Sequence, residues 1–391
     1  MRQSVQKIII LGSTGSIGTS TLNCIRRFPD RFKVSALAAG NNIGLLCRQI
    51  EEFKPEVVSI AGMQHVELLR ERFGGTVRIV KGPGALERLV EETESAIVVN
   101  ALVGAVGLRP TVVGLEKKNR VALANKESLV IGGELITALL AEGNGELVPV
   151  DSEHSAILQC LSGVSGTATV ESIILTASGG PFRTMPIDRF GSITPRDALN
   201  HPTWAMGKKI TVDAATLMNK GFEVIEAHHL FRLPYEQLRV WIHPQSIIHS
   251  LVEFHDGAMM AQLGLPDMEL PIQFALGYPE RLPMRGKRLS LPEIGSLEFC
   301  EPDYDRFPCL RLCLDAGKQG GTAPAVVNAA NEVAVAAFLE EKISFSDIAV
   351  VVEEALQSQK AQPATSVEEI ERADTAARNH AATTISRKGS A

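Results

Sequence analysis

The chain has 391 residues, of which 45% are hydrophobic, and its 39 basic and 45 acidic side chains give a formal net charge of −6. At about 150 residues per domain, this length predicts two or three domains with large buried cores, and the composition excludes a wholly disordered chain. The negative charge excludes the overall basic field of a nucleic-acid-binding protein, so we expect no nucleic-acid partner. An anion site would have to be built locally, from a few cations and backbone N–H groups.

The first 150 residues are predicted to form a doubly wound α/β domain. Short segments rich in β-branched residues recur there, and helical patterns lie between most of them. Apolar strands that alternate with helices are typical of a parallel sheet covered on both faces. The predicted strands are KIIIL (7–11), FKVSALAA (32–39), EVVSI (56–60), TVRIV (76–80), AIVVNAL (96–102), RVALA (120–124) and ELVPV (146–150).

A glycine-rich turn follows the first predicted strand. In GSTGSIG, Gly12, Gly15 and Gly18 lead from the strand into a helix, a variant of the dinucleotide-binding fingerprint in which the helix N-terminus receives the pyrophosphate. The second strand ends in ALAAGNNIG, without the acidic residue that holds the ribose 2′-hydroxyl of NAD. The sequence therefore favours NADP over NAD.

The segment ALANKES (122–128) follows another strand end and leaves two interpretations open. Asn125, Lys126 and Glu127 could face the crevice at the carboxyl edge of the sheet, where open α/β folds bind ligands. Alternatively, Asn125 caps a helix, and the Lys and Glu side chains are exposed to solvent.

The alternation of predicted strands and helices ends near residue 150. Residues 151–280 predict a smaller α+β catalytic domain with an open antiparallel or mixed sheet. An irregular, Gly- and Pro-rich stretch at about 179–209 is too long for a passive connection, so we interpret it as a mobile flap. Residues 281–305 are predicted to be a linker, and residues 306–391 a helical bundle. The predicted elements of the central domain are strands VESIILTAS, LRVWI, SIIHSLVEF and GAMMAQL and a helix AATLMNKGFEVIEAHHLF (214–231).

Three acidic residues form a candidate metal site. Asp151 and Glu153 stand two apart at a strand end, where alternation would place both on one side, although Asp151 or Ser152 could instead cap the following helix. A third carboxylate is available at Glu223, which shares a helix face with Asn219 at i−4 and has Lys220 beside it. Three oxygen ligands suit Mg²⁺ or Mn²⁺.

The cysteines and apolar stretches indicate a cytoplasmic protein. The chain contains no C-x-x-C pair, so we interpret its six cysteines as structural thiols in a reduced compartment; Cys309 and Cys313 have the spacing of one helix face. The first predicted strand begins almost at the N-terminus, which leaves no room for a signal or transit peptide. The longest apolar stretch is too short to span a bilayer, so we expect no membrane association.

The motifs resemble those of the 1-deoxy-D-xylulose 5-phosphate reductoisomerase family over essentially the whole chain. They occur in the same order as GSTGSIG, ALANKES, PVDSEHSAI, TASGGPF, HPTWAMGKKITVDAATLMNKGFEVIEA, HPQSIIHSLVEF and NAANEVAVAAFL. The resemblance implies an NADPH-dependent oxidoreductase that needs Mg²⁺, Mn²⁺ or Co²⁺. Such an enzyme rearranges its phosphorylated sugar and then reduces it to 2-C-methyl-D-erythritol 4-phosphate, in non-mevalonate isoprenoid biosynthesis. It also implies a homodimer paired through the central domain.

Matched position by position, the resemblance implies the site residues. The cofactor positions are Thr14, Gly15, Ser16, Ile17, Gly40, Asn41, Asn42, Asn125, Glu127 and Gly207. The metal positions are Asp151, Glu153 and Glu223. The substrate positions are Lys126, Ser152, Glu153, Ser178, His201, Trp204, Met206, Ala214, Asn219, Lys220 and Glu223, with Lys126 and Glu153 in catalytic roles and Trp204 and Met206 on the flap.

Two positions depart from the family pattern. Ala214 stands where members commonly carry a Ser whose hydroxyl donates to the substrate phosphate, so one hydrogen bond should be missing. Asn41 stands where many members carry Lys or Arg, which weakens the local case for NADPH. Two other functions are consistent with the glycine turn: an NADP-linked dehydrogenase of another phosphorylated polyol, which would need no divalent cation, and a nucleotide-sensing protein, in which the three acids would have decayed.

Overall fold

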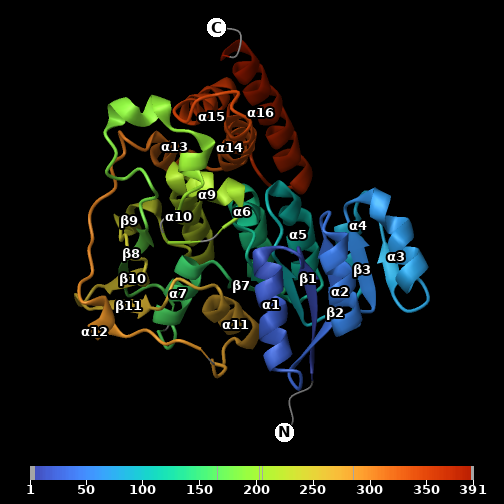
Figure 1. Ribbon diagram of the computed structural model, residues 1–391. Coiled ribbons are helices and arrows are strands. Elements are labelled where there is room, and N and C mark those ends of the chain that lie inside the picture. Colours follow the sequence, from blue (N-terminus) through green and yellow to red (C-terminus); the bar gives the residue numbers. More distant parts are fainter. Residues whose placement is uncertain (1–4, 165, 202, 205, 285, 389–391) are drawn as a thin grey trace. The chain divides into compact units, whose positions relative to one another are not determined.

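The computed structural model describes residues 5–164, 166–201, 203–204, 206–284 and 286–388 (Figure 1). The chain divides into two compact units, and each takes in several separate segments. Unit 1 comprises Met1–Asn125, Ala138–Ser155 and Asp267–Arg285. Unit 2 comprises Lys126–Thr137, Ala156–Pro266 and Gly286–Ala391.

Unit 1 is built on a seven-stranded sheet in the order β4-β3-β2-β1-β5-β6-β7, in which every pairing is parallel. All seven predicted strands are present, and the doubly wound α/β prediction is confirmed. The order reverses direction between β1 and β5, the position at which such sheets bind ligands. The strands are β1 (Gln6–Leu11), β2 (Phe32–Ala39), β3 (Val57–Ile60), β4 (Arg78–Val80), β5 (Ile97–Asn100), β6 (Arg120–Leu123) and β7 (Glu146–Pro149).

Helices follow most of these strands and bury the apolar faces of the sheet. One core cluster joins Ile9 and Leu11 of β1 with Val98 of β5 and Leu89 of a covering helix. A helix from much later in the chain, α11 (Glu269–Gly277), also belongs to this unit and lies beside α1 (Figure 1). The earlier helices are α1 (Ser16–Arg27), α2 (Ile43–Phe53), α3 (Val66–Phe73), α4 (Ala85–Glu92), α5 (Leu108–Glu116), α6 (Lys126–Ala141) and α7 (Ser152–Cys160), with 3₁₀ turns at Met63–His65 and Ala105–Gly107.

The turn after β1 requires glycine at two positions. Gly12 has φ +84°, and a Cβ there would lie 2.4 Å from the Ala101 carbonyl oxygen. A Cβ on Gly18 would lie 2.3 Å from the Gly12 carbonyl oxygen. The close approach of helix α1 to the turn therefore excludes side chains, and Gly15 becomes the N-cap of α1. This is the strand–turn–helix arrangement that the glycine spacing predicts.

Unit 2 contains a mixed four-stranded sheet in the order β11-β10-β8-β9. β10 pairs antiparallel with β8 and β11, whereas β8 and β9 are parallel. Helix α10 (Met218–Phe231) packs on this sheet, and their shared core includes Val224, Phe231, Ile173 and Val252. All four predicted strands are present: β8 (Val170–Ala177), β9 (Leu238–Ile242), β10 (Ile248–Phe254) and β11 (Met259–Leu263).

The long helix predicted at 214–231 is interrupted in the structure. Leu217 takes a left-handed conformation with φ +59°, which ends one helix and begins the next. A leucine there costs about 1–2 kcal/mol of backbone strain, and the side chain is buried, so tertiary packing sets this break. The helices are α9 (Lys208–Ala215) and α10 (Met218–Phe231).

The C-terminal part of unit 2 is helical, as predicted, and its four longer helices pack on one another (Figure 1). Cys309 and Cys313 lie buried on one face of the first of them. All six cysteines of the chain lie within the described residues, and they are free thiols. The helices are α13 (Pro308–Gln319), α14 (Ala323–Leu339), α15 (Asp347–Ser358) and α16 (Val367–Lys388); shorter ones in this unit are α8 (Pro195–Ala198), α12 (Leu291–Ile294) and 3₁₀ turns at Ile187–Ser192 and Tyr235–Gln237.

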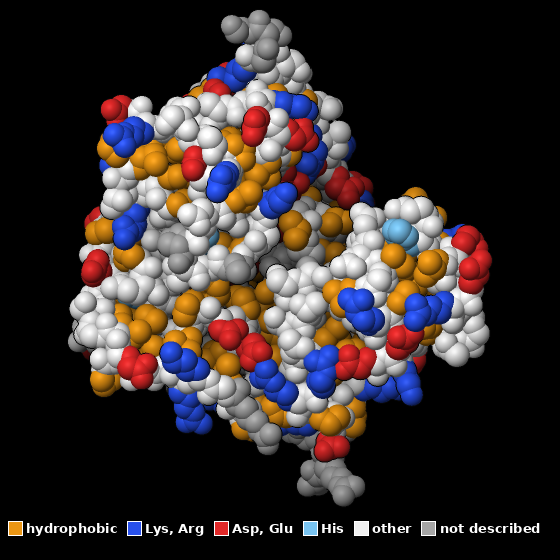
Figure 2. Space-filling view, in the orientation of Figure 1, with side chains coloured by type: hydrophobic (Ala, Val, Ile, Leu, Met, Phe, Trp, Pro, Cys, Tyr) orange, Lys and Arg blue, Asp and Glu red, His pale blue; other side chains and the backbone are white. Residues whose placement is uncertain are grey.

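The surface carries both signs of charge side by side. Figure 2 shows basic and acidic side chains interspersed on the visible face, as a chain with nearly balanced charges predicts. Several of them form exposed ion pairs, for example Arg26 with Glu52 and Lys7 with Glu94. Within the part of the chain that the structure describes, no helix is long and apolar enough to cross a membrane.

Candidate active site

Asp151 and Glu153 lie at the start of α7 and not within a strand. β7 ends at Pro149, and α7 begins at Ser152, so the predicted alternation along a strand is wrong as the reason for their proximity. Asp151 Oδ1 accepts a hydrogen bond from the Ser152 backbone N–H at 3.0 Å, and the Ser152 hydroxyl donates to the Glu153 carboxylate. The turn between sheet and helix therefore holds both carboxylates.

Glu223 lies on α10 and is the centre of a buried polar cluster. Its Oε1 accepts hydrogen bonds from Asn219 Nδ2 at 2.5 Å and from Lys126 Nζ at 3.1 Å, and its Oε2 accepts from Lys220 Nζ. Lys126 Nζ also donates to Asn219 Oδ1 at 2.7 Å. Glu223 is only 1% exposed. The i, i+4 contact between Asn219 and Glu223 that the sequence predicts is confirmed.

The two residues that begin α6 are both buried. Lys126 and Glu127 are each 6% exposed, and each forms an ion pair, Lys126 with Glu223 and Glu127 with Lys209. The alternative in which both side chains are solvent-exposed beside a capping Asn125 is therefore wrong. Asn125 instead donates its amide N–H groups to the carbonyl oxygens of Leu102 and Gly104, in the loop after β5.

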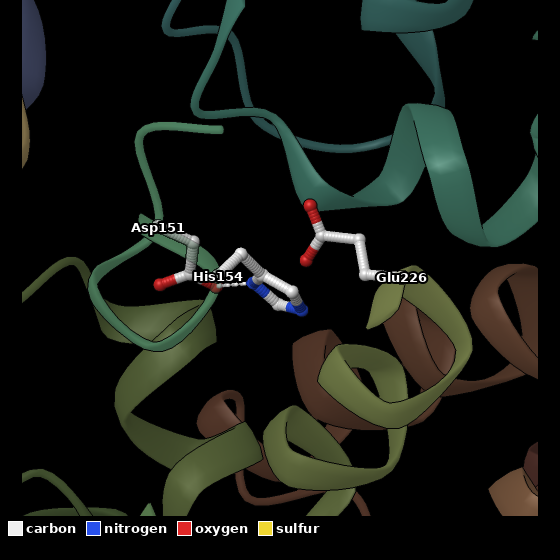
Figure 3. Close-up of side chains that lie close together, drawn as sticks. All are labelled: Asp151, His154 and Glu226. Atoms are coloured by element: carbon white, nitrogen blue, oxygen red, sulfur yellow. Dashed lines mark ion pairs between the residues drawn. The ribbon is translucent and has the colours of Figure 1, made fainter. Parts of the chain in front are cut away.

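Among the residues that the structure describes, two groups of side chains could each hold a metal ion, because the ligand atoms within each group all lie within 4.8 Å of one another. One group is Asp151, Glu153 and Glu223, the three predicted ligands. The other is Asp151, His154 and Glu226 (Figure 3). Figure 3 shows the His154 imidazole beside the Asp151 carboxylate, with His154 Nδ1 3.7 Å from Asp151 Oδ2. The three carboxylates offer the oxygen donors that Mg²⁺ and Mn²⁺ prefer, whereas the group with an imidazole is better suited to later transition metals.

Ser178 and His201 form a second polar group. His201 Nδ1 accepts the backbone N–H groups of Thr203 at 3.2 Å and Trp204 at 2.9 Å, so the ring proton of the neutral imidazole lies on Nε2. Nε2 is 3.1 Å from Ser178 Oγ, to which it can donate. Burial lowers the pKa of His201, which favours this neutral form. A neutral imidazole and a hydroxyl are thus held together as hydrogen-bonding groups.

The flap prediction is partly covered by the structure. Pro202 and Ala205 lie outside the described residues. The ring centroid of Trp204 lies 6.3 Å from that of His249, which is the second residue of β10, so the indole lies beside this imidazole. Met206 is partly exposed. Ala214 presents its backbone to the glycine pair after β8, because a Cβ on Gly180 would lie 2.9 Å from the Ala214 carbonyl oxygen.

The predicted cofactor positions are gathered at the ends of strands and the starts of helices. Thr14, Gly15, Ser16 and Ile17 form the turn into α1. Gly40, Asn41 and Asn42 follow β2; Asn42 Oδ1 accepts the Leu45 N–H at 3.1 Å as the N-cap of α2, and Asn41 Oδ1 lies next to Gly62. Gly207 is the N-cap of α9.

Sequence reasoning missed several buried polar residues. His154 and Glu226 join Asp151 in the second candidate group, and Lys209 pairs with Glu127 at 2.9 Å and with Asp213 at 2.9 Å. The i, i+4 spacing of Lys209 and Asp213 was available as a signal. His154 is likewise only three residues after Asp151, whereas the contacts with Glu226 and Glu127 join segments far apart in the sequence, so no local pattern could predict those.

The chain matches family models and curated relatives over nearly its whole length. Residues 8–133 match the model described as 1-deoxy-D-xylulose 5-phosphate reductoisomerase, residues 147–231 its C-terminal domain, and residues 263–380 the DXP reductoisomerase C-terminal domain. A 1-deoxy-D-xylulose 5-phosphate reductoisomerase from Prosthecochloris aestuarii is 51% identical over 97% of this chain and 99% of its own. One from Geobacillus sp. is 50% identical over 95% and 98%.

Solved structures agree with the whole fold. A DOX-P reductoisomerase in complex with NADPH, fosmidomycin and magnesium superposes with a TM-score of 0.93 at 39% identity, over 98% of both chains. The Zymomonas mobilis reductoisomerase in complex with NADPH gives a TM-score of 0.91 at 41% identity, over 98% of this chain and 99% of that one. Together with the site residues above, these similarities show that the chain belongs to the 1-deoxy-D-xylulose 5-phosphate reductoisomerase family.

Proposed function

We propose that this oxidoreductase converts 1-deoxy-D-xylulose 5-phosphate into 2-C-methyl-D-erythritol 4-phosphate, with NADPH and a divalent cation, through the residues described above. The observation that carries the proposal is the grouping of Asp151, Glu153 and Glu223, together with the cluster of Lys126, Asn219 and Lys220 around Glu223. It combines hard oxygen ligands for a cation with amine and amide donors for a phosphorylated sugar.

The side chains and backbone groups of the site fit both a divalent cation and NADPH. Three carboxylates match Mg²⁺ or Mn²⁺, and the all-oxygen group is the better candidate because the solved relative named above contains magnesium. Gly15 caps α1 without a side-chain hydrogen bond, so the N–H groups at the start of α1 remain available to a pyrophosphate, while Gly12 and Gly18 allow the turn to pack closely. When bound, the metal supplies Lewis-acid stabilisation of oxyanion charge, and NADPH supplies a hydride.

The phosphate of the substrate would be held by Ser178, His201, Asn219 and Lys220. Lys220 contributes the charge, and Asn219 contributes an amide donor. Ser178 Oγ accepts from the Gly180 N–H and lies at His201 Nε2, which leaves its own hydroxyl proton for a ligand oxygen. Neutral His201 adds a donor on Nε2 without adding charge.

Lys126 is the group best placed to act on the reacting carbons. Its ammonium is buried beside Glu223, so it can donate a proton or a hydrogen bond to an oxyanion that forms on the substrate. Glu153 belongs to the ligand group and receives the Ser152 hydroxyl, so it can relay a proton between substrate and its surroundings. Trp204, with Met206, would cover the carbon chain and exclude water.

We further propose a cytosolic homodimer. The free cysteines, five of them buried, suit a reduced compartment. β11 is an edge strand of the unit 2 sheet, and Met259 and Met260 on it are each 46% exposed. An edge strand with exposed apolar side chains favours pairing with another chain.

The proposed activity is tested by NADPH oxidation with 1-deoxy-D-xylulose 5-phosphate and Mn²⁺, followed by absorbance at 340 nm. We expect turnover that EDTA abolishes and added Mn²⁺ restores. NADH should give a lower kcat/KM than NADPH. Turnover that is insensitive to EDTA would instead favour a metal-independent dehydrogenase of another phosphorylated polyol, and NADPH binding without any turnover would favour a nucleotide sensor.

Glu223→Gln should weaken Mn²⁺ binding and lower kcat. Changing residues that only surround a metal ligand costs about 10- to 100-fold, so losing a ligand charge should lower kcat at least about 100-fold. Mn²⁺ affinity is measured by titration calorimetry and kcat by the 340 nm assay. Glu332→Gln is the matched control, because Glu332 is a partly buried carboxylate of the same unit, paired with Arg378. Normal Mn²⁺ affinity in Glu223→Gln would show that Glu223 is not a ligand.

Ala214→Ser should lower the KM for the phosphorylated sugar. A hydroxyl placed there would donate to a charged phosphate oxygen, a bond worth about 1.5–3 kcal/mol, so KM should fall about tenfold or more with little change in kcat. Ala215→Ser, at the next and buried position of α9, is the control that adds a hydroxyl without that role. An unchanged KM in Ala214→Ser would mean that the hydroxyl does not reach the phosphate.

The dimer is tested by sedimentation velocity, which should give twice the chain mass of 42.1 kDa. Met259→Lys together with Met260→Lys should shift the species toward the monomer, because two charges would be buried in the interface. A dimer that persists unchanged in this variant would place the interface elsewhere.

A further inference from the structure

Lys209 is held between two carboxylates within unit 2. Its Nζ lies 2.9 Å from Glu127 Oε1 and 2.9 Å from Asp213 Oδ2. Both acids are nearly inaccessible, and the Lys209 side chain is 19% exposed. The ammonium also lies over the Phe222 ring, 5.1 Å from its centroid. Three contacts, with residues of three helices, therefore fix the position of one cation.

Asn331 stabilises this arrangement through a hydrogen bond to Asp213. Asn331 of α14 is fully buried and donates from Nδ2 to Asp213 Oδ1 at 2.8 Å. One oxygen of Asp213 is thus held by the C-terminal helices, while the other holds Lys209. The chain of contacts runs from Asn331 through Asp213 and Lys209 to Glu127.

The two ends of the ion pair belong to segments with predicted cofactor contacts. Glu127 lies in the first turn of α6, directly after Lys126. Lys209 lies in the first turn of α9, two residues after Gly207, its N-cap. The Lys209–Glu127 pair therefore joins the starts of two helices, each of which carries one predicted cofactor position.

Stability alone is a weak reason for such a cluster. Removing charges from water is unfavourable, and well-packed apolar side chains often stabilise a core as well as a buried ion pair does. A fixed carboxylate, in contrast, is useful as an acceptor for the ribose hydroxyls or the carboxamide of a nicotinamide nucleotide. Burial would raise the pKa of Glu127, but the charge and hydrogen bond of Lys209 hold the pKa below its ordinary value, so the carboxyl stays ionised. Burial works against the Lys209 ammonium too, yet Asp213 and Glu127 hold its pKa above the ordinary value.

We propose that Lys209 is a positioning residue for the cofactor: it orients the Glu127 carboxylate as a hydrogen-bond acceptor for NADPH and fixes it against the start of α9. Asp213 and Asn331 set the position of Lys209 in turn. This inference rests on the proposed NADPH-dependent function, because it assigns Glu127 to that cofactor.

The test is a double-mutant cycle on NADPH affinity, read by fluorescence titration of the full chain without metal or substrate. Lys209→Met should raise the Kd for NADPH about tenfold, about 1.4 kcal/mol, and Glu127→Gln should raise it similarly. Because Lys209 acts through Glu127, the double variant should bind no more weakly than Glu127→Gln alone. For Lys209→Met at saturating NADPH, kcat and the KM for the sugar should stay within about threefold. Lys209→Arg should retain most of the affinity for NADPH.

Arg378→Met is the matched control for lost stability. Arg378 pairs with Asp374 and Glu332 in the same unit, at the residue next to Asn331, and has no place in the proposed site. It should lower the melting temperature and leave the Kd for NADPH unchanged. If Lys209→Met does not fold, the comparison of the double variant with Glu127→Gln decides, because the double variant has no Glu127 charge that has lost the Lys209 ammonium.

Two results would overturn the role of Lys209: a Lys209→Met Kd within twofold of the unmodified chain, or effects of the two substitutions that multiply. The proposed function fails differently. An unmodified chain that binds NADPH but does not turn over the sugar would contradict the reaction, while the same titrations would still decide the role of Lys209. An unmodified chain that does not bind NADPH would contradict both.

Discussion

The burial of the Glu223 carboxylate is the constraint on which the rest of the site depends. An ion removed from water costs several kcal/mol unless charges and hydrogen bonds replace the lost solvation. Here Lys126, Lys220 and Asn219 replace it, and they are also side chains that we propose to bind the substrate. The Glu223 oxygens proposed to bind a cation are thus the oxygens that accept hydrogen bonds from these proposed substrate-binding groups. A cation bound by Glu223 would therefore share these two oxygens with Lys126, Lys220 and Asn219.

Local geometry explains how much of this the sequence could predict. Strands rich in β-branched residues and a glycine turn are local features, and all eleven strands and the tight Gly12 turn lie where the patterns place them. The contacts of Asn219 and Lys220 with Glu223 also follow from helix periodicity, because residues three and four apart share a face. These predictions succeed because neighbours in the sequence determine them.

The failures share a different cause. Leucine favours helices, so nothing local predicts that Leu217 would take φ +59° and separate α9 from α10; packing of its buried side chain decides. Asp151 and Glu153 are brought together by the start of a helix that begins three residues after the strand ends. Glu127 and Lys209 are 82 positions apart, and Asp213 and Asn331 are 118 apart, so only the fold pairs them.

The first turn of α6 unites the two buried clusters. Adjacent residues on a helix point in different directions, so Lys126 and Glu127 reach different partners. Lys126 pairs with Glu223 of α10, and Glu127 pairs with Lys209 of α9. Helix α6 therefore contributes the cation of the ion pair with α10 and the anion of the ion pair with α9. Leu217, in its left-handed conformation, separates these two helices, so the two ion pairs are made by different helices. On an unbroken helix over 208–231, Lys209 and Glu223 would be about 21 Å apart along one axis, whereas in the structure each pairs with one of two adjacent residues of α6.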